Sequence, residues 1–178
     1  MYENMTDKFA VRKNKDPHGW GYSETAGFLV DGKFTGFVWI VEDYVDADHH
    51  RLFICGIVMP YSDRYEFGCL YDDDLRNKVN VRYLGEAERF YKELRLECDD
   101  MKRIVFCGQF ADSERCGLGS EFSYDSFGNI TEFQGLWERG ILTHRREGDR
   151  LVPVTPEEAA VHRFDPEKCT LTESPVSE

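Results

Sequence analysis

The sequence lacks the features that define several large protein classes. Lys and Arg number only 22 against 34 Asp and Glu, which gives a formal net charge of −12 over 178 residues. A surface of this sign repels phosphate backbones and anionic headgroups, so we expect no nucleic acid partner and disfavour membrane lipid. No apolar run approaches the length that crosses a bilayer, and no apolar segment near the start is typical of a signal peptide. The chain is therefore expected to be cytoplasmic.

The spacing of the six cysteines excludes common metal and redox motifs. They lie at positions 55, 69, 98, 107, 116 and 169, and no two have the Cys-x-x-Cys spacing. Cys107 and Cys116 could face each other across a hairpin, but as small buried side chains they need no redox role. Reduced thiols fit a cytoplasmic chain, and one domain of this length can bury a core without metals or disulfides.

Motifs of catalysis and metal binding are also missing. The sequence contains no Gly-x-Ser-x-Gly elbow, no His-Glu-x-x-His, no P-loop and no dinucleotide fingerprint. His49 and His50 follow Asp46 and Asp48, but adjacent side chains on a strand point to opposite faces, so a solvated loop is favoured over a metal site. Asp72–Asp74 similarly favours an acidic turn over a calcium loop. We expect no catalytic residues, no metal and no cofactor.

Aromatic residues and turn-forming pairs are abundant. Thirteen Phe, nine Tyr and three Trp favour pleated surfaces. Alternating stretches predict strands at 34–41, 51–59, 65–71, 79–84, 104–110, 119–124 and 132–137. Turn clusters such as Asp31-Gly32 and Asp112-Ser113 separate them, and these residues tolerate the left-handed backbone of tight turns. The pattern predicts an all-β chain of antiparallel hairpins.

The remaining segments are less regular. Residues 86–97 combine helix formers with an alternating end, and we favour two strands there. "HRREGDR" at 144–150 is a basic island that could meet an acidic partner, although a solvated linker is favoured. Thr155, Pro156 and Glu158 form a helix-capping signature, which predicts a short helix at 156–164 followed by a loosely held tail. The predicted units are a hairpin domain at 1–150 and a helix and tail at 151–178.

Glycines recur at fixed offsets. Gly32 and Gly36 follow Gly27 at five and nine residues, Gly117 and Gly119 follow Gly108 at nine and eleven, and Gly140 follows Gly135 at five. Internal spacing of this kind is the signature of repeated supersecondary units. The positions assigned to the repeat are Gly27, Gly32, Gly36, Phe106, Gly108, Phe110, Gly117, Gly119, Phe133, Gly135, Trp137 and Gly140.

This spacing resembles the MORN repeat (membrane occupation and recognition nexus) family. "FQGLWERG" at 133–140, "FCGQF" with "CGLG", and "AGFLVDGKFTGF" at 26–37 carry the resemblance, and "HGWGY" matches the end of a preceding unit. The likeness covers 18–41 and 104–143, and the central repeats are degenerate. Ser113 and His144 stand where the pattern has glycine. The resemblance implies an elongated, solenoid-like array of antiparallel hairpins.

The residues give a physical reason for such units. On a strand, Phe106, Gly108 and Phe110 share one face, so the glycine leaves a gap between two rings that a ring of the neighbouring hairpin can fill. A single hairpin cannot bury this aromatic stripe, so hairpins must stack. The helix at 156–164 could cap the C-terminal end of the array or pack on its outside.

The expected function follows from the resemblance. MORN-like repeats imply a non-catalytic protein–protein interaction or scaffold module in a cytoskeletal, ciliary or other multiprotein assembly. Exposed aromatics at Tyr22, Tyr83 and Tyr124 are the expected contact residues. The alternative is a phospholipid-binding adaptor or a regulatory domain that acts with a separate enzyme. Self-association into a homodimer through an uncovered N-terminal edge is a further expectation.

Overall fold

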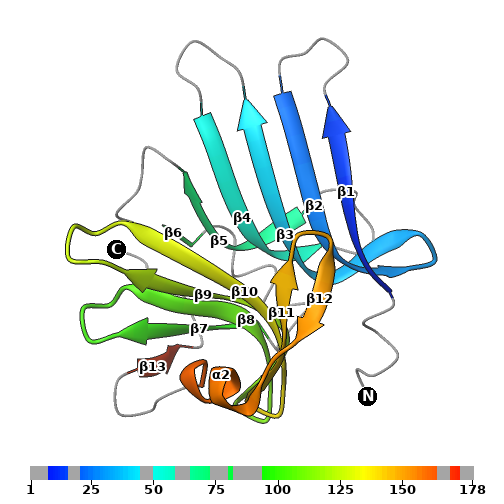
Figure 1. Ribbon diagram of the computed structural model, residues 1–178. Coiled ribbons are helices and arrows are strands. Elements are labelled where there is room, and N and C mark those ends of the chain that lie inside the picture. Colours follow the sequence, from blue (N-terminus) through cyan, green and yellow to red (C-terminus); the bar gives the residue numbers. More distant parts are fainter. Residues whose placement is uncertain are drawn as a thin grey trace.

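The protein consists of two antiparallel sheets and one short helix (Figure 1). The computed structural model describes residues 8–15, 21–44, 50–58, 65–72, 80–81, 94–163 and 169–172. Sheet A contains, in order, β1 (Phe9–Lys15), β2 (Gly21–Val30), β3 (Lys33–Tyr44), β4 (His50–Val58), β5 (Tyr65–Asp72) and β6 (Asn80–Val81). Sheet B contains, in order, β12 (Arg150–Pro153), β11 (Ile141–Glu147), β10 (Ile130–Glu138), β9 (Glu114–Tyr124), β8 (Ile104–Ala111), β7 (Leu94–Asp99) and β13 (Cys169–Thr172). The predicted antiparallel all-β class with one short helix is confirmed, whereas the elongated solenoid-like array is not.

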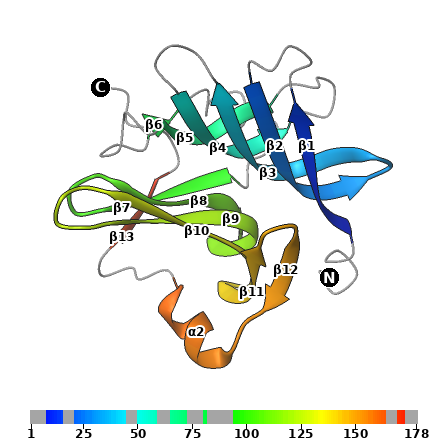
Figure 2. The ribbon, with the colours of Figure 1, turned by 45° about the horizontal axis from the view of Figure 1, so that its top comes forward.

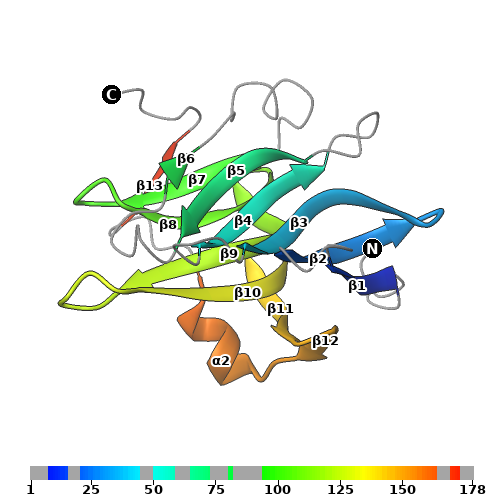
Figure 3. The ribbon, with the colours of Figure 1, turned by 90° about the horizontal axis from the view of Figure 1, so that it is seen from above.

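The two sheets face each other and share a core. β3 lies against β9, β1 against β12, and β4 and β5 against β8. Figure 2 shows sheet A, sheet B and the helix as successive layers, and Figure 3 shows the helix beside β10 and β11. The core between the sheets is formed by Ala26, Phe28, Phe37, Trp39 and Cys55 of sheet A with Leu96, Ile104, Cys107, Leu118, Phe122 and Leu136 of sheet B. Each sheet thus buries one face against the other.

The helix α2 (Pro156–Val161) covers the opposite face of sheet B. The Thr155 hydroxyl accepts a hydrogen bond from the Glu158 N–H, as the capping signature predicts. The helix ends earlier than predicted, and His162 is its C-cap. Ala159 packs into a second core with Phe106, Phe110, Trp137 and Leu142. The helix therefore packs on a face of sheet B and not over an open strand edge.

The same hairpin turn occurs three times. In β2–β3, β8–β9 and β10–β11 the two turn residues have positive φ: 51° and 77°, 52° and 63°, and 51° and 75°. Positive φ at both central residues is the type I′ geometry, whose twist matches that of the strands. The register also shifts just before each turn, beside Gly27, Gly108 and Trp137. The five-residue offset therefore marks one repeated backbone unit, in which Ser113 adopts the glycine conformation.

The nine-residue offset marks a contact between the sheets. Gly36 of sheet A and Gly117 of sheet B both have positive φ, 76° and 94°. The Gln109 side chain lies beside both: a Cβ at Gly36 would be 3.6 Å from its Nε2, and a Cβ at Gly117 would be 2.5 Å from its Oε1. Equivalent glycines of two hairpins thus border the same amide side chain.

Several segments differ from their sequence-based interpretation. Six of the seven predicted strands are found, and of the seventh, 79–84, the structure describes only Asn80–Val81, which form β6. Leu94–Asp99 confirms a strand at the end of 86–97, and residues 86–93 lie outside the described residues. The basic island at 144–150 is not a linker, because it forms most of the β11–β12 hairpin. The tail is not loosely held throughout, since Cys169–Thr172 pairs with β7. The predicted domain boundary at residue 150 falls inside sheet B.

Candidate functional site

A row of alternating charged and aromatic residues crosses the helix-covered face of sheet B. In strand register, Glu97 of β7 lies opposite Phe106 of β8, which lies opposite Glu121 of β9. Glu121 in turn lies opposite Phe133 of β10. Because directly opposite residues in a sheet share a face, these four side chains point toward the same side. This row is the base of the candidate site.

A row of glycines beside it makes room for the rings. Gly108, Gly119 and Gly135 are aligned across β8, β9 and β10. A Cβ at Gly119 would lie 2.5 Å from Cζ of Phe106, and one at Gly108 would lie 2.7 Å from the same ring. Phe106 therefore lies flat over two glycines, and its ring meets Trp137 edge to face at 5.1 Å.

This arrangement corrects one expectation and confirms another. The ring over Gly108 is Phe106 of the same strand, not a ring of a neighbouring hairpin. The gap is nevertheless one that only glycine permits, and Phe110 and Trp137 are buried, as predicted. Because residues two apart on a strand share a face, the Phe106 ring can lie over Gly108 of its own strand. Strand periodicity alone did not indicate this contact.

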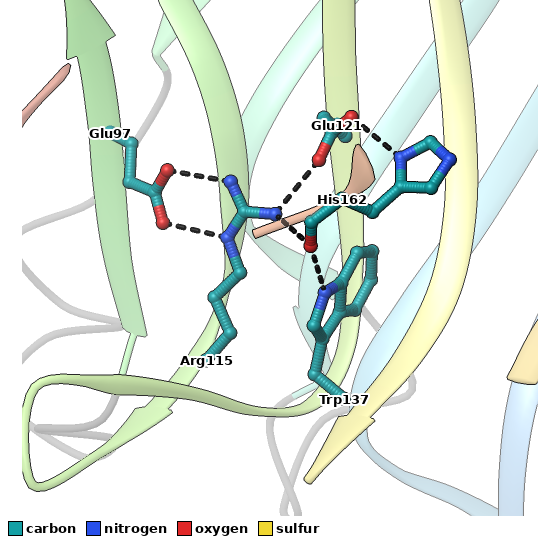
Figure 4. Close-up of polar contacts among 5 residues, drawn as sticks. All are labelled: Glu97, Arg115, Glu121, Trp137 and His162. Carbon is teal, nitrogen blue, oxygen red and sulfur yellow. Dashed lines mark hydrogen bonds and ion pairs between the residues drawn. The ribbon is translucent and has the colours of Figure 1, made fainter. Parts of the chain in front are cut away.

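Arg115 joins the two acidic members of the row (Figure 4). Its Nε and Nη2 donate to the two carboxylate oxygens of Glu97 at 2.7 and 2.6 Å. Its Nη1 donates to Oε2 of Glu121 at 2.8 Å and to the carbonyl oxygen of His162 at 3.2 Å. The guanidinium lies 4.0 Å from the centroid of Phe106. Arg115 thus spans the ring that separates its two carboxylate partners.

His162 connects this cluster to the helix. Its carbonyl also accepts from the Trp137 indole N–H at 3.0 Å, and its Nδ1 lies 2.8 Å from Oε1 of Glu121. The imidazole stacks on Phe133 with a centroid separation of 4.0 Å. We call Glu97, Arg115, Glu121, Trp137 and His162 the Arg115 cluster. Its contacts fix the C-terminal end of α2 on the sheet.

Burial controls the pKa of Glu97, whereas hydrogen bonds and charge control that of Arg115. Glu97 is fully buried and the Arg115 side chain is 3% exposed. Burial raises the pKa of Glu97 above its usual value, although the hydrogen bonds and charge of Arg115 act in the opposite direction. Burial alone would lower the pKa of Arg115, but its bonds to Glu97 and Glu121 outweigh this effect and raise it. The arginine therefore stays charged.

The chemistry available to the cluster is that of a clamp. A carboxylate that accepts two arginine hydrogen bonds is held in place, and a guanidinium has no proton to give up at physiological pH. A second ion pair, in which Arg145 Nη1 donates to Glu158 at 2.9 and 3.1 Å, holds the start of the helix. The arrangement fixes α2 across β9, β10 and β11.

A second polar network connects the two sheets. The Trp39 indole N–H donates to Ser120 at 2.7 Å, and the Ser120 hydroxyl donates to Glu132 at 2.6 Å. Arg146 donates to Gln134 at 2.8 Å and to Glu24 of sheet A at 2.6 Å. We call these residues, with Tyr22, the Arg146 chain. Burial acts to raise the pKa of Glu24, but its bonds from Arg146 and Tyr22 lower it below the usual value.

The tyrosines expected to form one exposed face do not do so where the structure describes them. Tyr22 is half-buried and donates to Glu24 at 3.0 Å. Tyr124 is half-buried on sheet B, packs against the shared core and donates to the Ile104 carbonyl at 2.7 Å. Tyr83 lies outside the described residues. Their role in binding stays a prediction.

The other candidates have different outcomes. His49, Asp46, Asp48 and residues 73–74 lie outside the described part of the chain, as do the side chains of His50 and Asp72. Among the described residues, no group of three or more His, Cys, Asp or Glu converges as metal ligands. Cys107 does not face Cys116, because Ser120 is its partner on β9.

Sequence reasoning missed the Arg115 cluster. Glu97, Arg115, Glu121 and His162 are far apart in the chain and each resembles an ordinary surface charge. One local signal was present. In an alternating strand, Arg115 and Glu121 lie on the same face as Gly117 and Gly119 between them, and this is the face that carries the aromatic side chains. The strand register was needed to bring Glu97 and His162 to them.

Comparison with known proteins adds no relatives. No protein-family model, no curated protein and no solved structure matches this chain. In the part of the chain that the structure describes, no helix has both the length and the apolar character to cross a membrane.

Proposed function

We propose that this chain is a non-catalytic protein–protein interaction module that acts as a scaffold within a cytoplasmic assembly. The observation that carries the proposal is the repeated hairpin, in which β2–β3, β8–β9 and β10–β11 share one turn geometry and one glycine spacing. Repeated units of this kind commonly build extended binding surfaces. We also propose that the hairpins are MORN-like units of an array, in keeping with a cytoskeletal, ciliary or similar multiprotein setting.

The Arg115 cluster supports a structural role for the charged groups of sheet B. Its carboxylates and guanidinium are engaged with one another and with the helix carbonyl. An arrangement of this kind holds a surface in a fixed shape, which lowers the entropy lost when a partner binds. A sandwich whose described hairpin turns are short and held by hydrogen bonds is suited to presenting side chains to another protein.

The test is affinity capture of the full chain from its source cells, followed by mass spectrometry and reconstitution with purified partner. An unrelated acidic protein of similar charge serves as the control for binding driven by charge alone. A partner that binds the chain and not the control, at a defined stoichiometry, is the expected result. Flotation with phosphatidylcholine vesicles, with and without phosphoinositides, tests the lipid-binding alternative, and vesicle binding without any protein partner would replace the proposal.

A further inference from the structure

Two neighbouring loops of sheet B each display one large apolar side chain. The β7–β8 loop presents Met101, which is 70% exposed, and the β9–β10 loop presents Phe127, which is 85% exposed. Because β7, β8, β9 and β10 are consecutive antiparallel strands, both loops lie at the same end of the sheet, as Figure 1 shows. We call Met101 and Phe127 the loop-tip pair.

The β7–β8 loop is held by an aspartate at its first position. Oδ1 of Asp99 accepts from the N–H groups of Met101 and Arg103 at 3.0 and 2.9 Å, and Oδ2 accepts from Nε of Arg103 at 2.7 Å. The Asp99 N–H donates to the Arg103 carbonyl, and the Asp99 carbonyl accepts from the N–H of Lys102. Lys102 adopts a positive φ of 59°.

The β9–β10 loop repeats this arrangement contact by contact. Oδ1 of Asp125 accepts from the N–H groups of Phe127 and Asn129 at 2.9 and 2.8 Å, and Oδ2 accepts from Nδ2 of Asn129 at 2.8 Å. The same two backbone bonds close the loop, and Gly128 has the positive φ, 81°. The bonds from Asn129, with those from the loop N–H groups, lower the pKa of Asp125. In both loops the displayed apolar residue is the third of five.

The two loops are also fixed relative to each other. The residue before the second loop, Tyr124, donates its hydroxyl proton to the Ile104 carbonyl directly after the first loop. The guanidinium of Arg103 lies 4.6 Å from the centroid of the Tyr124 ring. The spacing between the loop tips is therefore set by side-chain contacts as well as by the pairing of β8 with β9. Because the loop backbones are already fixed, little backbone entropy is lost when these side chains enter a fitted pocket.

The charge of the chain indicates the kind of partner surface that the loop-tip pair contacts. Asp99 is paired with Arg103, and the exposed Asp100 and Lys102 have opposite signs, so Asp125 leaves one net negative charge on the two loops within a chain of net charge −12. A chain of this charge is attracted to basic surfaces. A fluid lipid surface requires no fixed spacing between apolar groups, and an anionic one would repel this chain.

We propose that the loop-tip pair is the anchor by which this chain docks on a protein with two adjacent apolar pockets set in a basic surface. This inference rests on the proposed interaction function and specifies the surface that is used. Aromatic residues and Met are enriched in the buried core of protein interfaces, and a few such residues carry most of the binding energy.

The test compares four variants of the full chain. Phe127→Ser and Met101→Ser remove the anchors, Asp125→Ala keeps both anchors but releases one loop, and Val161→Ser removes an exposed apolar side chain from α2 as the matched control. Each variant is used for affinity capture with mass spectrometry, and each recovered protein is titrated in purified form by calorimetry. Circular dichroism melts verify that all four variants fold.

The expected result is one protein retained by the wild type and by Val161→Ser. Its affinity falls roughly ten- to a hundred-fold with each anchor variant, because an apolar side chain is no longer buried. Asp125→Ala weakens it by about three- to tenfold through lost preorganisation. Higher salt slows the association of this partner with the chain, because salt screens the attraction between the acidic chain and a basic partner surface.

Other outcomes overturn the inference in distinguishable ways. A partner that binds the anchor variants as well as the wild type refutes the loop-tip anchor and leaves the scaffold function standing. The absence of any partner specific to the wild type refutes both proposals. Binding to phosphatidylcholine vesicles that depends on Phe127, with no protein partner, identifies a lipid surface as the occupant instead.

Discussion

The two arginine networks of this protein use the same chemistry in different surroundings. Arg115 binds Glu97 where the two side chains are 3% and 0% exposed, and Arg146 binds Glu24 where they are 10% and 19% exposed. Burial is the largest single influence on both carboxylates: it raises the pKa of Glu97 despite Arg115, whereas at Glu24 the bonds from Arg146 and Tyr22 together outweigh it and lower the pKa. The degree of burial thus decides whether the fold favours the charged carboxylate.

The comparison also separates two kinds of structural role. The Arg115 cluster lies on the outer face of sheet B, where it orders α2 over the aromatic row. The Arg146 chain lies between the sheets, where it connects Glu24 of sheet A with Gln134 of sheet B. Breaking the Arg115 cluster should leave a buried charge without a partner in an apolar layer. In the Arg146 chain, water can reach the polar groups that lose their partner, so the loss should be smaller.

The largest effect is expected from Arg115→Met. Glu97 would remain fully buried with no cationic partner, which should lower the free energy of unfolding by about 3–5 kcal/mol. Urea denaturation followed by circular dichroism measures this loss. The matched control is the double variant Glu97→Leu/Arg115→Met, which removes the pair as a whole and should regain much of the stability. A single variant less than about 1 kcal/mol below the wild type would contradict the account of a buried clamp.

The second prediction tests the glycine row beside the cluster. Gly119→Ala should cost about 1–3 kcal/mol, because the added Cβ would lie 2.5 Å from Phe106 and 3.3 Å from the Cys107 carbonyl. The double variant with Phe106→Leu should cost less than the sum of the single changes, since the smaller side chain can move aside. Gly32→Asn is the control: its positive φ of 77° suits Asn, and no atom lies within 4 Å of its Cβ position. Additive costs would argue against a ring packed on the glycines.

The third prediction concerns the connection between the sheets. Arg146→Met removes the bonds to Gln134 and Glu24 at a partly accessible position and should lower the free energy of unfolding by about 1–2 kcal/mol. The loss should be clearly smaller than that of Arg115→Met, measured in the same urea titration. Equal losses in the two variants would show that burial does not distinguish the networks.

Local features of the fold could be predicted from the sequence because local backbone chemistry determines them. The clusters Asp31-Gly32 and Asp112-Ser113 correctly located two of the three I′ turns, and the Thr155 signature correctly identified the helix start. These features depend on a few adjacent residues whose φ preferences and hydrogen bonds act alone. Alternation likewise located the strands that line the core.

Long-range features could not be predicted in the same way. The facing of the sheets depends on contacts such as Trp39 with Ser120, 81 residues apart. The return of Cys169–Thr172 to β7 depends on a strand edge that the sequence does not reveal. The Arg115 cluster depends on register across three strands and on the position of α2. A charged residue reads as a surface group until its burial is known.

The last prediction uses the opposite pKa directions of the two glutamates. The folded pKa of Glu24 lies below 4.5, so its contribution to stability is present above pH 4.5 and is lost as the pH falls through the lowered pKa. The folded pKa of Glu97 lies above 4.5, so its contribution is present below pH 4.5 and is lost as the pH rises through the raised pKa.

Unfolding free energies of the wild type, Glu24→Gln and Glu97→Gln, measured by urea titration at a series of acidic to neutral pH values, test this contrast. The stability of the wild type relative to Glu24→Gln should increase with pH below 4.5, and that relative to Glu97→Gln should decrease with pH above 4.5. Each slope cannot exceed about 1.4 kcal/mol per pH unit, because one proton is involved. Because the substitutions are the same and only the surroundings differ, stability that increases with pH in both comparisons would mean that hydrogen bonding, and not burial, controls both carboxylates.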